Sequence, residues 1–400
     1  MSLKGLSDVT YEIICYIGAG KGKSGRRTME KRYNFRIYPT KKQEIQIQKN
    51  FGCARFAYNH YLQKRIEAHK GGHGLLSHNE CCRDLTTLKR LEGFGWLRDA
   101  DSDSLHFALR DLDSAFMAFF RKVKQGGVHP GFPKFKTKRE TRQSYRSKNK
   151  TERQSIEISG RKIKLPKLGQ VECRVSKQIE GRILSATVIQ SPSGKYHVSV
   201  CCTGVEPQPL PKTGATVGLH MGVRSLATTS DGRQFENPRA FEKARKKTAR
   251  LQREMSRKPK GSKNREKARV KLARAYEKAA NQKKDYLQKL TTQLVREYDS
   301  ICVRDEALTQ IAKNPLYAKY VSDAGWGEFF RQLEYKCDWY GKELIKISGQ
   351  HPSAQLCSAC GARNPKPPAP REWTCQVCGA RHNRAVNAAA NILQEGMRGA

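Results

Sequence analysis

Hydrophobic and polar positions alternate with two different periods in the first third of the chain. Residues 33–38 (YNFRIY) alternate with a period of two and end at Pro39, which predicts a β-strand. Thr40 can cap a helix directly after this strand, and apolar residues then recur at helical spacing. The predicted helices lie at residues 41–65, 85–91 and 105–123.

The pattern changes after residue 126. Residues 126–136 are rich in Gly and Pro and predict a turn-rich exit from the helices. Short alternating segments follow, and their spacing is typical of a small β-barrel. The predicted strands are residues 155–158, 162–165, 171–175, 183–190 and 196–202. Residues 205–212 hold three prolines in eight positions and predict a linker.

Strands and helices alternate again in the second half of the chain, around one basic segment. Residues 243–284 hold 18 Lys or Arg and three Glu, and a break at Pro259–Gly261 predicts a helical hairpin that continues to Glu297. A solvated face would also explain such charges, but an excess of six to one favours a surface that follows phosphates. The other predicted elements are strands at 216–219, 224–229, 233–235, 300–303 and 344–347, and helices at 326–340 and 381–393.

The composition limits the class of protein. With 400 residues and 37% apolar residues, the chain can form two or three domains with a real core. Lys plus Arg number 77 against 37 Asp plus Glu, a formal charge of +40, and this excess predicts a long nucleic acid as partner. A membrane surface is disfavoured because no apolar run approaches the length of a spanning helix and no lipidation motif is present.

Four cysteines near the C-terminus have the spacing of a metal site. They form two C-x2-C pairs separated by fourteen residues, Cys357 with Cys360 and Cys375 with Cys378. Four thiolates in a tetrahedron suit Zn2+ in a closed structural site, and Gly361 and Gly379 allow a tight turn after each pair. The alternative is four buried free cysteines. The nine other cysteines lack ligand spacing and are interpreted as small apolar residues.

The N-terminal segment and the thiols bear on localisation. Residues 1–28 are Gly-rich and basic and predict a disordered leader. Tyr11–Ile17 is too short for a secretory signal core and lacks a convincing cleavage site after it. Because a zinc site goes with reduced thiols, the predicted location is a prokaryotic cytoplasm, at the nucleoid.

The order of these elements, together with several local strings, resembles one known family. The order is strand, turn, strand, basic helical insertion, strand, helix, zinc ribbon and a helix that carries NAAANI. KRYNFRIYPT, FGCARFAYNHYL, ALRDLDSAF and GFPKFK resemble the same family in its N-terminal part. Over residues 29–393 the chain therefore resembles TnpB, the RNA-guided nuclease of insertion sequences and relative of the miniature type V CRISPR effectors.

The resemblance implies an α+β multidomain fold, with a β-barrel wedge, an inserted helical recognition lobe, an RNase-H-like RuvC domain and a zinc ribbon. The implied boundaries are a wedge at 29–40 and 126–211, a recognition lobe at 41–125, a RuvC-like domain at 212–350 with the basic helical hairpin at 241–297, a zinc ribbon at 351–380, and the last RuvC-like segment with a tail at 381–400.

In the family, Asp, Glu and Asp from three distant places bind two Mg2+ ions for phosphodiester cleavage. The matching strings here are GLHMG at 218–222, ICVRD at 301–305 and RAVNAA at 384–389. The three carboxylate positions are therefore His220, Arg304 and Ala385, and Asn383 replaces the usual Asp before the third. A neutral imidazole binds Mg2+ poorly and a guanidinium repels it. The resemblance thus implies lost catalytic residues and no Mg2+ at this site.

Three hypotheses fit these replacements: a nuclease-dead TnpB-like repressor, an active or residually active endonuclease with a rearranged metal site, and a non-specific nucleic-acid-binding remnant. The intact strings around each position favour the first. The chain is thus predicted not to be an enzyme, and to repress transcription by holding an R-loop at a guide-matched target beside a short adjacent motif. The expected partners are a guide RNA with a structured scaffold and a variable end, and double-stranded DNA, with one chain per guide.

Position within the family's strings also suggests contact residues for the nucleic acids. Candidates for the adjacent motif are Tyr58, Asn59, Lys64 and Thr87; for phosphates, Arg110, Arg121, Lys122, Lys134 and Lys136; for guide RNA, Arg245, Arg250, Lys263 and Arg269. Core packing or simple solvation explains any one of them equally well.

Overall fold

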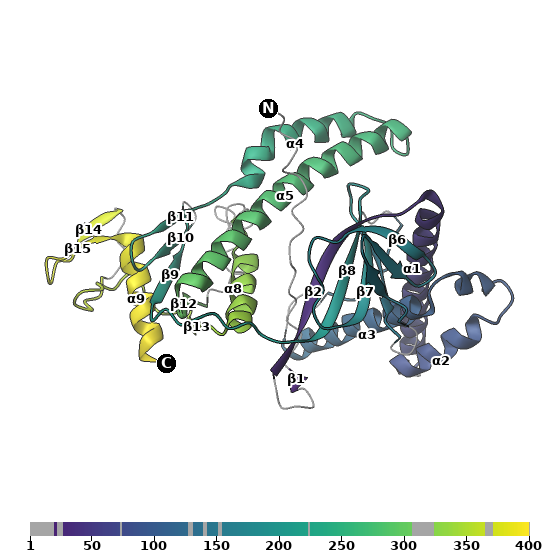
Figure 1. The fold of residues 1–400 in the computed structure, drawn as a ribbon, viewed down its shortest axis with the longest axis horizontal. Coiled ribbons are helices and arrows are strands. Elements are labelled where there is room, and N and C mark those ends of the chain that lie inside the picture. The colour runs from purple at the N-terminus through teal and green to yellow at the C-terminus, as the bar shows by residue number, and fades with distance from the viewer. Residues whose placement is uncertain are drawn as a thin grey trace. The chain divides into compact units, whose positions relative to one another are not determined.

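The computed structural model divides into two units, one reaching to Val205 and the other beginning at Glu206 (Figure 1). The described residues are 20–21, 27–72, 74–126, 131–138, 142–150, 154–222, 225–305, 324–364 and 371–399. The predicted leader at residues 1–28 lies for the most part outside them.

An eight-stranded antiparallel sheet is the framework of the first unit. Its longest strand, β2 (Arg27–Tyr38), pairs with β8 along most of its length and with β6 at its end. Alternate residues of β2 face the core, so Tyr33, Phe35 and Ile37 are buried. The order is β3-β7-β8-β2-β6-β5-β4, with β1 also on β2. The bounds are β1 (Gly20–Lys21), β3 (Gln143–Lys148), β4 (Glu157–Ser159), β5 (Lys162–Leu165), β6 (Gly169–Arg174), β7 (Arg182–Gln190) and β8 (Tyr196–Val205).

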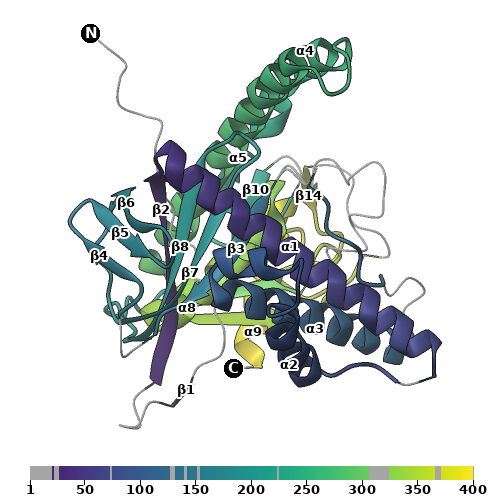
Figure 2. The same cartoon turned by 90° about the vertical axis from the view of Figure 1, so that its right-hand side faces the viewer.

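Helices α1 (Lys41–Lys70), α2 (His78–Leu88) and α3 (Ser102–Lys124) complete this unit, with a short 3-10 helix at Gly95–Asp99. The Thr40 side chain accepts a hydrogen bond from the backbone of Gln43, whose side chain accepts one from the Thr40 backbone. Helix α1 packs against α3, and both contact β3 (Figure 2). Among the largest fully buried side chains here are Tyr61, Leu62, Leu85, Leu105, Leu109 and Leu112.

The second unit contains a mixed sheet of five strands in the order β11-β10-β9-β12-β13. Strands β9, β12 and β13 are parallel neighbours, whereas β10 and β11 run antiparallel at one edge. The bounds are β9 (Thr216–Met221), β10 (Ser225–Thr229), β11 (Gln234–Glu236), β12 (Ser300–Arg304) and β13 (Glu343–Ile347).

Different helices cover the two faces of this sheet (Figure 1). Helices α5 (Lys263–Glu297) and α8 (Trp326–Tyr340) cover one face, where Leu219, Val303 and Phe329 are buried together. Helix α9 (Arg384–Arg398) lies on the other face, where Cys302 is buried with Ile392. The basic hairpin consists of α4 (Ala240–Ser256) side by side with the first part of α5 (Figure 2).

Two glycines let α9 approach the sheet closely. A Cβ atom added at Gly218 would lie 2.1 Å from the Ala389 carbonyl oxygen, a backbone atom of α9. A Cβ atom added at Gly396 would lie 2.4 Å from the Cys302 Sγ atom on β12. Both distances are far below van der Waals contact, so any larger side chain would push the helix away.

Two predicted helices have other bounds in the structure, and one strand of the first sheet was missed. The predicted helix at 381–393 begins only at Arg384, because residues 381–383 form β15 and pair with β14 (Glu372–Thr374). The helix predicted at 85–91 begins at His78, after a capping box between Ser77 and Glu80. Strand β3 was not predicted at all.

Candidate nucleic-acid site and metal centre

The strand pairing brings together two of the positions that resemble the family's carboxylates. Leu219 of β9 lies opposite Val303 of β12 in parallel register, so His220 and Arg304 follow side by side at the strand ends. Because side chains alternate, both lie on the face that carries α9, as Cys302 does. Both are half-buried.

The third position lies at the start of α9. Asn383 is the N-cap of this helix, and its Oδ1 atom accepts hydrogen bonds from the backbone amides of Ala385 and Val386, at 3.1 and 3.4 Å. Asn383 therefore occupies the usual place of an N-cap Asp without adding a charge. Arg384 is the exposed first residue of the helix, and Ala385 follows it half-buried.

The strand ends at His220 and Arg304 and the start of α9 together form a corner of the second unit, called the positive corner below because the charged groups beside His220 are arginines. Burial, together with the smaller effects of the Arg304 and Arg384 guanidinium groups, lowers the pKa of His220 to about 4. At neutral pH His220 is therefore a neutral imidazole facing two permanent cations. Asp305 follows Arg304; its backbone amide donates to the Ile347 carbonyl at 2.9 Å, and the residue is exposed.

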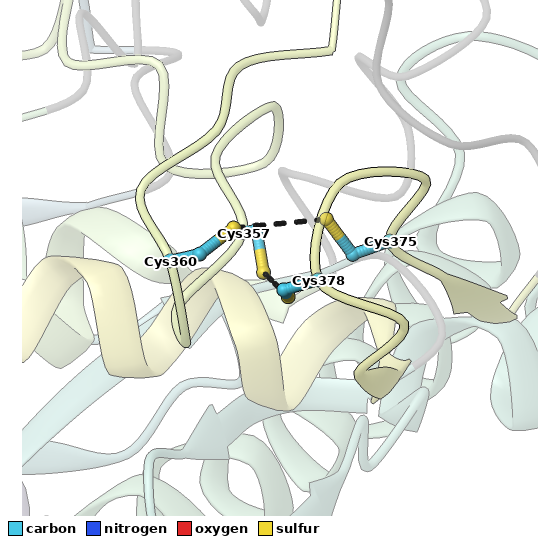
Figure 3. Close-up of side chains that lie close together, drawn as sticks. All are labelled: Cys357, Cys360, Cys375 and Cys378. Atoms are coloured by element: carbon cyan, nitrogen blue, oxygen red, sulfur yellow. Dashed lines mark hydrogen bonds between the residues drawn. The ribbon is translucent and has the colours of Figure 1, made fainter.

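The four cysteines form a cluster that can hold a metal ion, because their sulfur atoms all lie within 4.8 Å of one another. Figure 3 shows the side chains converging from two loops, with Cys357 Sγ 3.7 Å from Cys378 Sγ and Cys360 Sγ 3.8 Å from Cys375 Sγ. A tetrahedral Zn2+ with Zn–S bonds of about 2.3 Å places its sulfurs about 3.8 Å apart. The cluster therefore fits Zn2+ as a structural ion.

The two halves of the cluster have the same backbone geometry. The amide of Gly361 donates to the Cys357 carbonyl at 2.8 Å, and the amide of Gly379 donates to the Cys375 carbonyl at 2.9 Å. Both glycines have a left-handed φ, 75° and 71°, which closes each turn without strain. Backbone amides of Cys378 and Val377 are the largest causes that lower the pKa of Cys375 to about 6, which favours its thiolate.

Helix α9 is tied directly to this ribbon. The Asn387 side chain accepts from the Ser358 amide at 2.8 Å and donates to the Leu356 carbonyl at 2.7 Å. The Asn391 side chain donates to the carbonyls of Ser353 and Leu356, both at 2.8 Å. The positive corner and the metal centre thus share one helix.

Several predicted contact residues of the first unit have roles within the fold. Tyr58 is buried beneath the Lys136 ammonium, which lies 4.1 Å from its ring centroid. Asn59 exchanges two hydrogen bonds of 2.8 Å with the backbone of Lys136, and Lys64 forms a 2.7 Å ion pair with Asp84. These contacts fix the segment around Lys136. Exposed candidates in this unit are Thr87, Arg110, Arg121, Lys122 and Lys134.

A cationic pocket that the sequence did not predict lies between α1, α3 and β3. Its charged lining residues are Arg55, Asp111, Lys136, Arg142 and Arg146, four cations and one carboxylate. An aromatic ring, Phe107, lines the same pocket, with the Arg146 guanidinium 4.9 Å from its centroid. Interleaved arginine and aromatic groups of this kind suit a nucleotide or a phosphate.

In the second unit the predicted guide-contact residues lie along the hairpin. Arg245, Arg250 and Lys263 are exposed. The Arg269 guanidinium forms an ion pair with the Glu266 carboxylate, with N–O distances of 2.8 and 2.6 Å. Within the described residues, no helix combines the length and the apolar character needed to cross a bilayer.

Comparisons with known proteins match three parts of the chain to family models. Residues 199–313 match the OrfB_IS605 model, described as "Probable transposase", and residues 326–392 match the "Cas12f1-like, TNB domain". Residues 29–74 match a model described as "Helix-turn-helix domain". In the structure this last segment is strand β2 followed by the 30-residue helix α1.

Similar proteins are found along almost the whole chain. A Streptomyces pristinaespiralis protein named "Putative RNA-guided DNA endonuclease" is 36% identical over 373 residues, which cover 92% of this chain and 90% of the relative. An Escherichia coli (strain K12) protein named "Putative RNA-guided DNA endonuclease InsQ" is 32% identical, covering 91% and 92%. A solved Cas12f1-sgRNA-target DNA complex has a TM-score of 0.58 at 14% identity, covering 91% of this chain and 98% of that one.

The fold and the matches above show a multidomain α+β protein with a RuvC-like domain and a four-cysteine cluster that can hold zinc. The predicted fold class is therefore confirmed. The chain belongs to the TnpB family, whose relatives above are named as RNA-guided DNA endonucleases.

These relatives correct one prediction. The chain was predicted not to be an enzyme, but it belongs to an endonuclease family and shares the fold of Cas12f1. The prediction went too far because it rested on the replacements at the three family positions, and metal ligands can come from elsewhere in a chain. Replaced residues at His220, Arg304 and Ala385 do not by themselves show inactivity.

Proposed function

We propose that this chain binds a structured guide RNA and, through it, a matched double-stranded DNA beside a short adjacent motif. The bound DNA is held as an R-loop in the prokaryotic cytoplasm, and an R-loop at a promoter represses transcription by obstructing RNA polymerase. Sequence is selected by base pairing, while the protein supplies charge and shape. The wedge and recognition lobe occupy residues 29–211, and the RuvC-like part begins at residue 212.

Family membership is the observation that carries this proposal, because the relatives are named RNA-guided and the matching fold was solved with an sgRNA and target DNA. Charge supports it in each unit. The hairpin segment 243–284 has 18 cations and three Glu, and the pocket beside Phe107 has four cations and one carboxylate. Such surfaces neutralise phosphates along a strand and release counterions.

We further propose that Zn2+ occupies the four-cysteine cluster as a structural ion, and that no Mg2+ binds between His220, Arg304 and Ala385. A guanidinium, a neutral ring and a methyl group offer no hard oxygen ligand to a dication. Zinc bound at the cysteines would fix the two loops relative to α9 and would leave no open coordination position.

A second candidate function is RNA-guided cleavage of DNA, which the names of the relatives favour. In this chain the ligands for catalytic metal would have to come from carboxylates outside the three positions. The exposed Asp305, directly after Arg304, is the nearest in sequence.

One experiment tests both candidates. The RNA that co-purifies with the protein is sequenced, and the loaded protein is incubated with matched and seed-mismatched duplexes at two salt concentrations, with EDTA, Mg2+ or Mn2+. Guided binding predicts one RNA scaffold, tighter binding of the matched duplex and a steep loss with salt. Equal affinity for both duplexes refutes it.

Cleavage of the labelled matched strand is measured in the same samples. Metal-dependent products that disappear in Asp305→Ala support the second candidate. A matched promoter in front of a reporter gene then measures repression, and unchanged expression with a bound guide refutes the repressor part of the proposal.

A further inference from the structure

We infer that His220, Arg304 and Arg384 form a metal-independent binding site for one phosphate of a nucleic-acid strand. The corner where the family resemblance places metal-binding carboxylates holds His220, the neighbouring Arg304 and, at the start of α9, Arg384. That the phosphate belongs to a nucleic acid rests on the proposed function, whereas the anion-binding chemistry does not.

Three separate elements build this site. Strand β9 supplies His220 and strand β12 supplies Arg304, in adjacent positions of a parallel pair and on one face of the sheet. Helix α9 supplies Arg384 from its first turn, and it lies close to that face because Gly218 has no side chain. The positions are therefore fixed by the sheet and by the packing of a 15-residue helix, with no contribution from a long loop.

The charges of the site select an anion. Arg304 lies beside His220 across the parallel strand pair, and Arg384 lies in the first turn of the helix packed on the same face. Both positive charges are near enough to the His220 ring to lower its pKa. A guanidinium presents several N–H groups in a plane and matches two phosphate oxygens at once. The neutral imidazole can donate one further hydrogen bond. The Ala385 side chain adds only a methyl group, so the third position contributes no competing negative charge.

The charges of these groups favour a phosphodiester over a metal ion. A dication is repelled by the guanidinium groups, whereas each phosphodiester of a strand carries a negative charge that pairs with them. The first turn of α9 adds the positive end of the helix dipole, although Asn383 already occupies two of its amides. The exposure of Arg384 leaves the site open to a strand from solvent.

The direct test uses the charge-removing variants Arg304→Gln and Arg384→Gln, with Arg304→Lys and Arg398→Gln as controls. Arg398 is exposed on the last turn of the same helix, so its change removes one charge without touching the site. Each variant is assayed on a ten-nucleotide thymidine oligomer in buffer without added divalent ions, by fluorescence anisotropy over a range of salt. The folded state is checked by circular dichroism and by zinc content.

We expect each of the two Gln variants to lose about tenfold in affinity. In the double variant, the slope of the logarithm of the binding constant against the logarithm of the salt concentration should be shallower by about 0.7, the value of one phosphate on a single strand. Arg304→Lys should retain more affinity than Arg304→Gln, and Arg398→Gln should retain the wild-type slope. Equal losses for Arg384→Gln and Arg398→Gln would overturn the inference, and so would binding that requires a divalent ion.

A second measurement locates the phosphate. Guide-loaded protein is bound to a matched duplex with a preformed bubble, in which single phosphates are replaced by neutral methylphosphonates. One replacement should weaken binding by the wild type and have no effect on the Arg304→Gln, Arg384→Gln double variant. If no replacement depends on these arginines, the site is not a phosphate site. Failure of guided binding itself would instead appear as equal affinity for matched and mismatched duplexes, while the oligomer assay still reports on the site.

Discussion

The close approach of α9 to the sheet gives a test of the fold through the pair Gly396 and Cys302. In Gly396→Ala the new Cβ atom would meet Cys302 Sγ at 2.4 Å and Cys302 Cβ at 2.9 Å. Overpacking of this kind costs about 1–3 kcal/mol, and the severity of the contact places it near the upper end. Replacing glycine inside a helix recovers about 1 kcal/mol. The free energy of unfolding should therefore fall by about 2 kcal/mol.

The second change in the cycle is Cys302→Ala, which removes the sulfur atom that obstructs the new methyl group. Alone, this change should cost about 1 kcal/mol, because a small buried group is lost. Combined with Gly396→Ala, it should cost less than the sum of the two single changes, with a favourable coupling of about 1–2 kcal/mol. The double variant should thus be no less stable than Gly396→Ala.

The assay is thermal unfolding of the full chain, with hydrogen exchange of the α9 peptide to assign the effect to this helix. In a unit of about 200 residues, 2 kcal/mol corresponds to a decrease in Tm of about 4–8 °C. Gly399→Ala is the matched control, since a Cβ atom there has no atom within 4 Å and the backbone φ is −102°. Additive losses in the double variant would refute the close packing.

Four further predictions follow from the two C-terminal sites and the hairpin. Burial and the two neighbouring arginines lower the pKa of His220 from 6.5 to about 4, so between these pH values the unfolded chain binds a proton that the folded chain excludes. The free energy of unfolding should therefore fall by up to about 3 kcal/mol as the pH drops from about 6.5 to about 4. His220→Gln should flatten this pH profile, measured by denaturant titration. Cys375→Ser should lower the zinc content measured by elemental analysis and increase hydrogen exchange in both knuckles, and an equally zinc-rich variant would contradict the cluster. Asn383→Ala should cost about 0.5–2 kcal/mol and increase exchange in the first turn of α9 alone. Arg245→Gln with Arg250→Gln should reduce affinity for the co-purified RNA and make its salt slope shallower by up to about 1.4, and an unchanged slope would exclude this surface.

Much of the fold could be predicted from the sequence where local pattern and long-range pairing agree. Helix α8 and strand β5 were predicted with their observed bounds, since their apolar spacing decides the structure. Strand β3 was missed because its core-facing residues include only one large apolar side chain, Tyr145. Its strand conformation depends on pairing with β7, which is distant in the sequence. Strand β15 was missed because three residues carry no detectable period and need β14 as a partner.

The candidate site was predicted less completely. The strings around His220 and Arg304 indicated the strand ends, and period-two alternation is enough to place both on one face. Arg384 was not predicted, although its position directly before Ala385 at the start of the helix was a usable signal. Asn59 was a candidate for the adjacent motif, with core packing left open as an alternative. Its amide holds the Lys136 backbone, a contact between residues 77 positions apart that no local pattern encodes.

The string NAAAN in α9 is explained by neighbours on two sides. Asn387 and Asn391, one turn apart, bind the ribbon loops, while the buried Ala388 and Ala389 leave room for the helix backbone against Gly218. None of these contacts involves a reacting group. The string is therefore required by the packing of α9, and it places no constraint on the side chains at His220 and Arg304. A search that relies on this string therefore finds the scaffold and does not by itself report the activity.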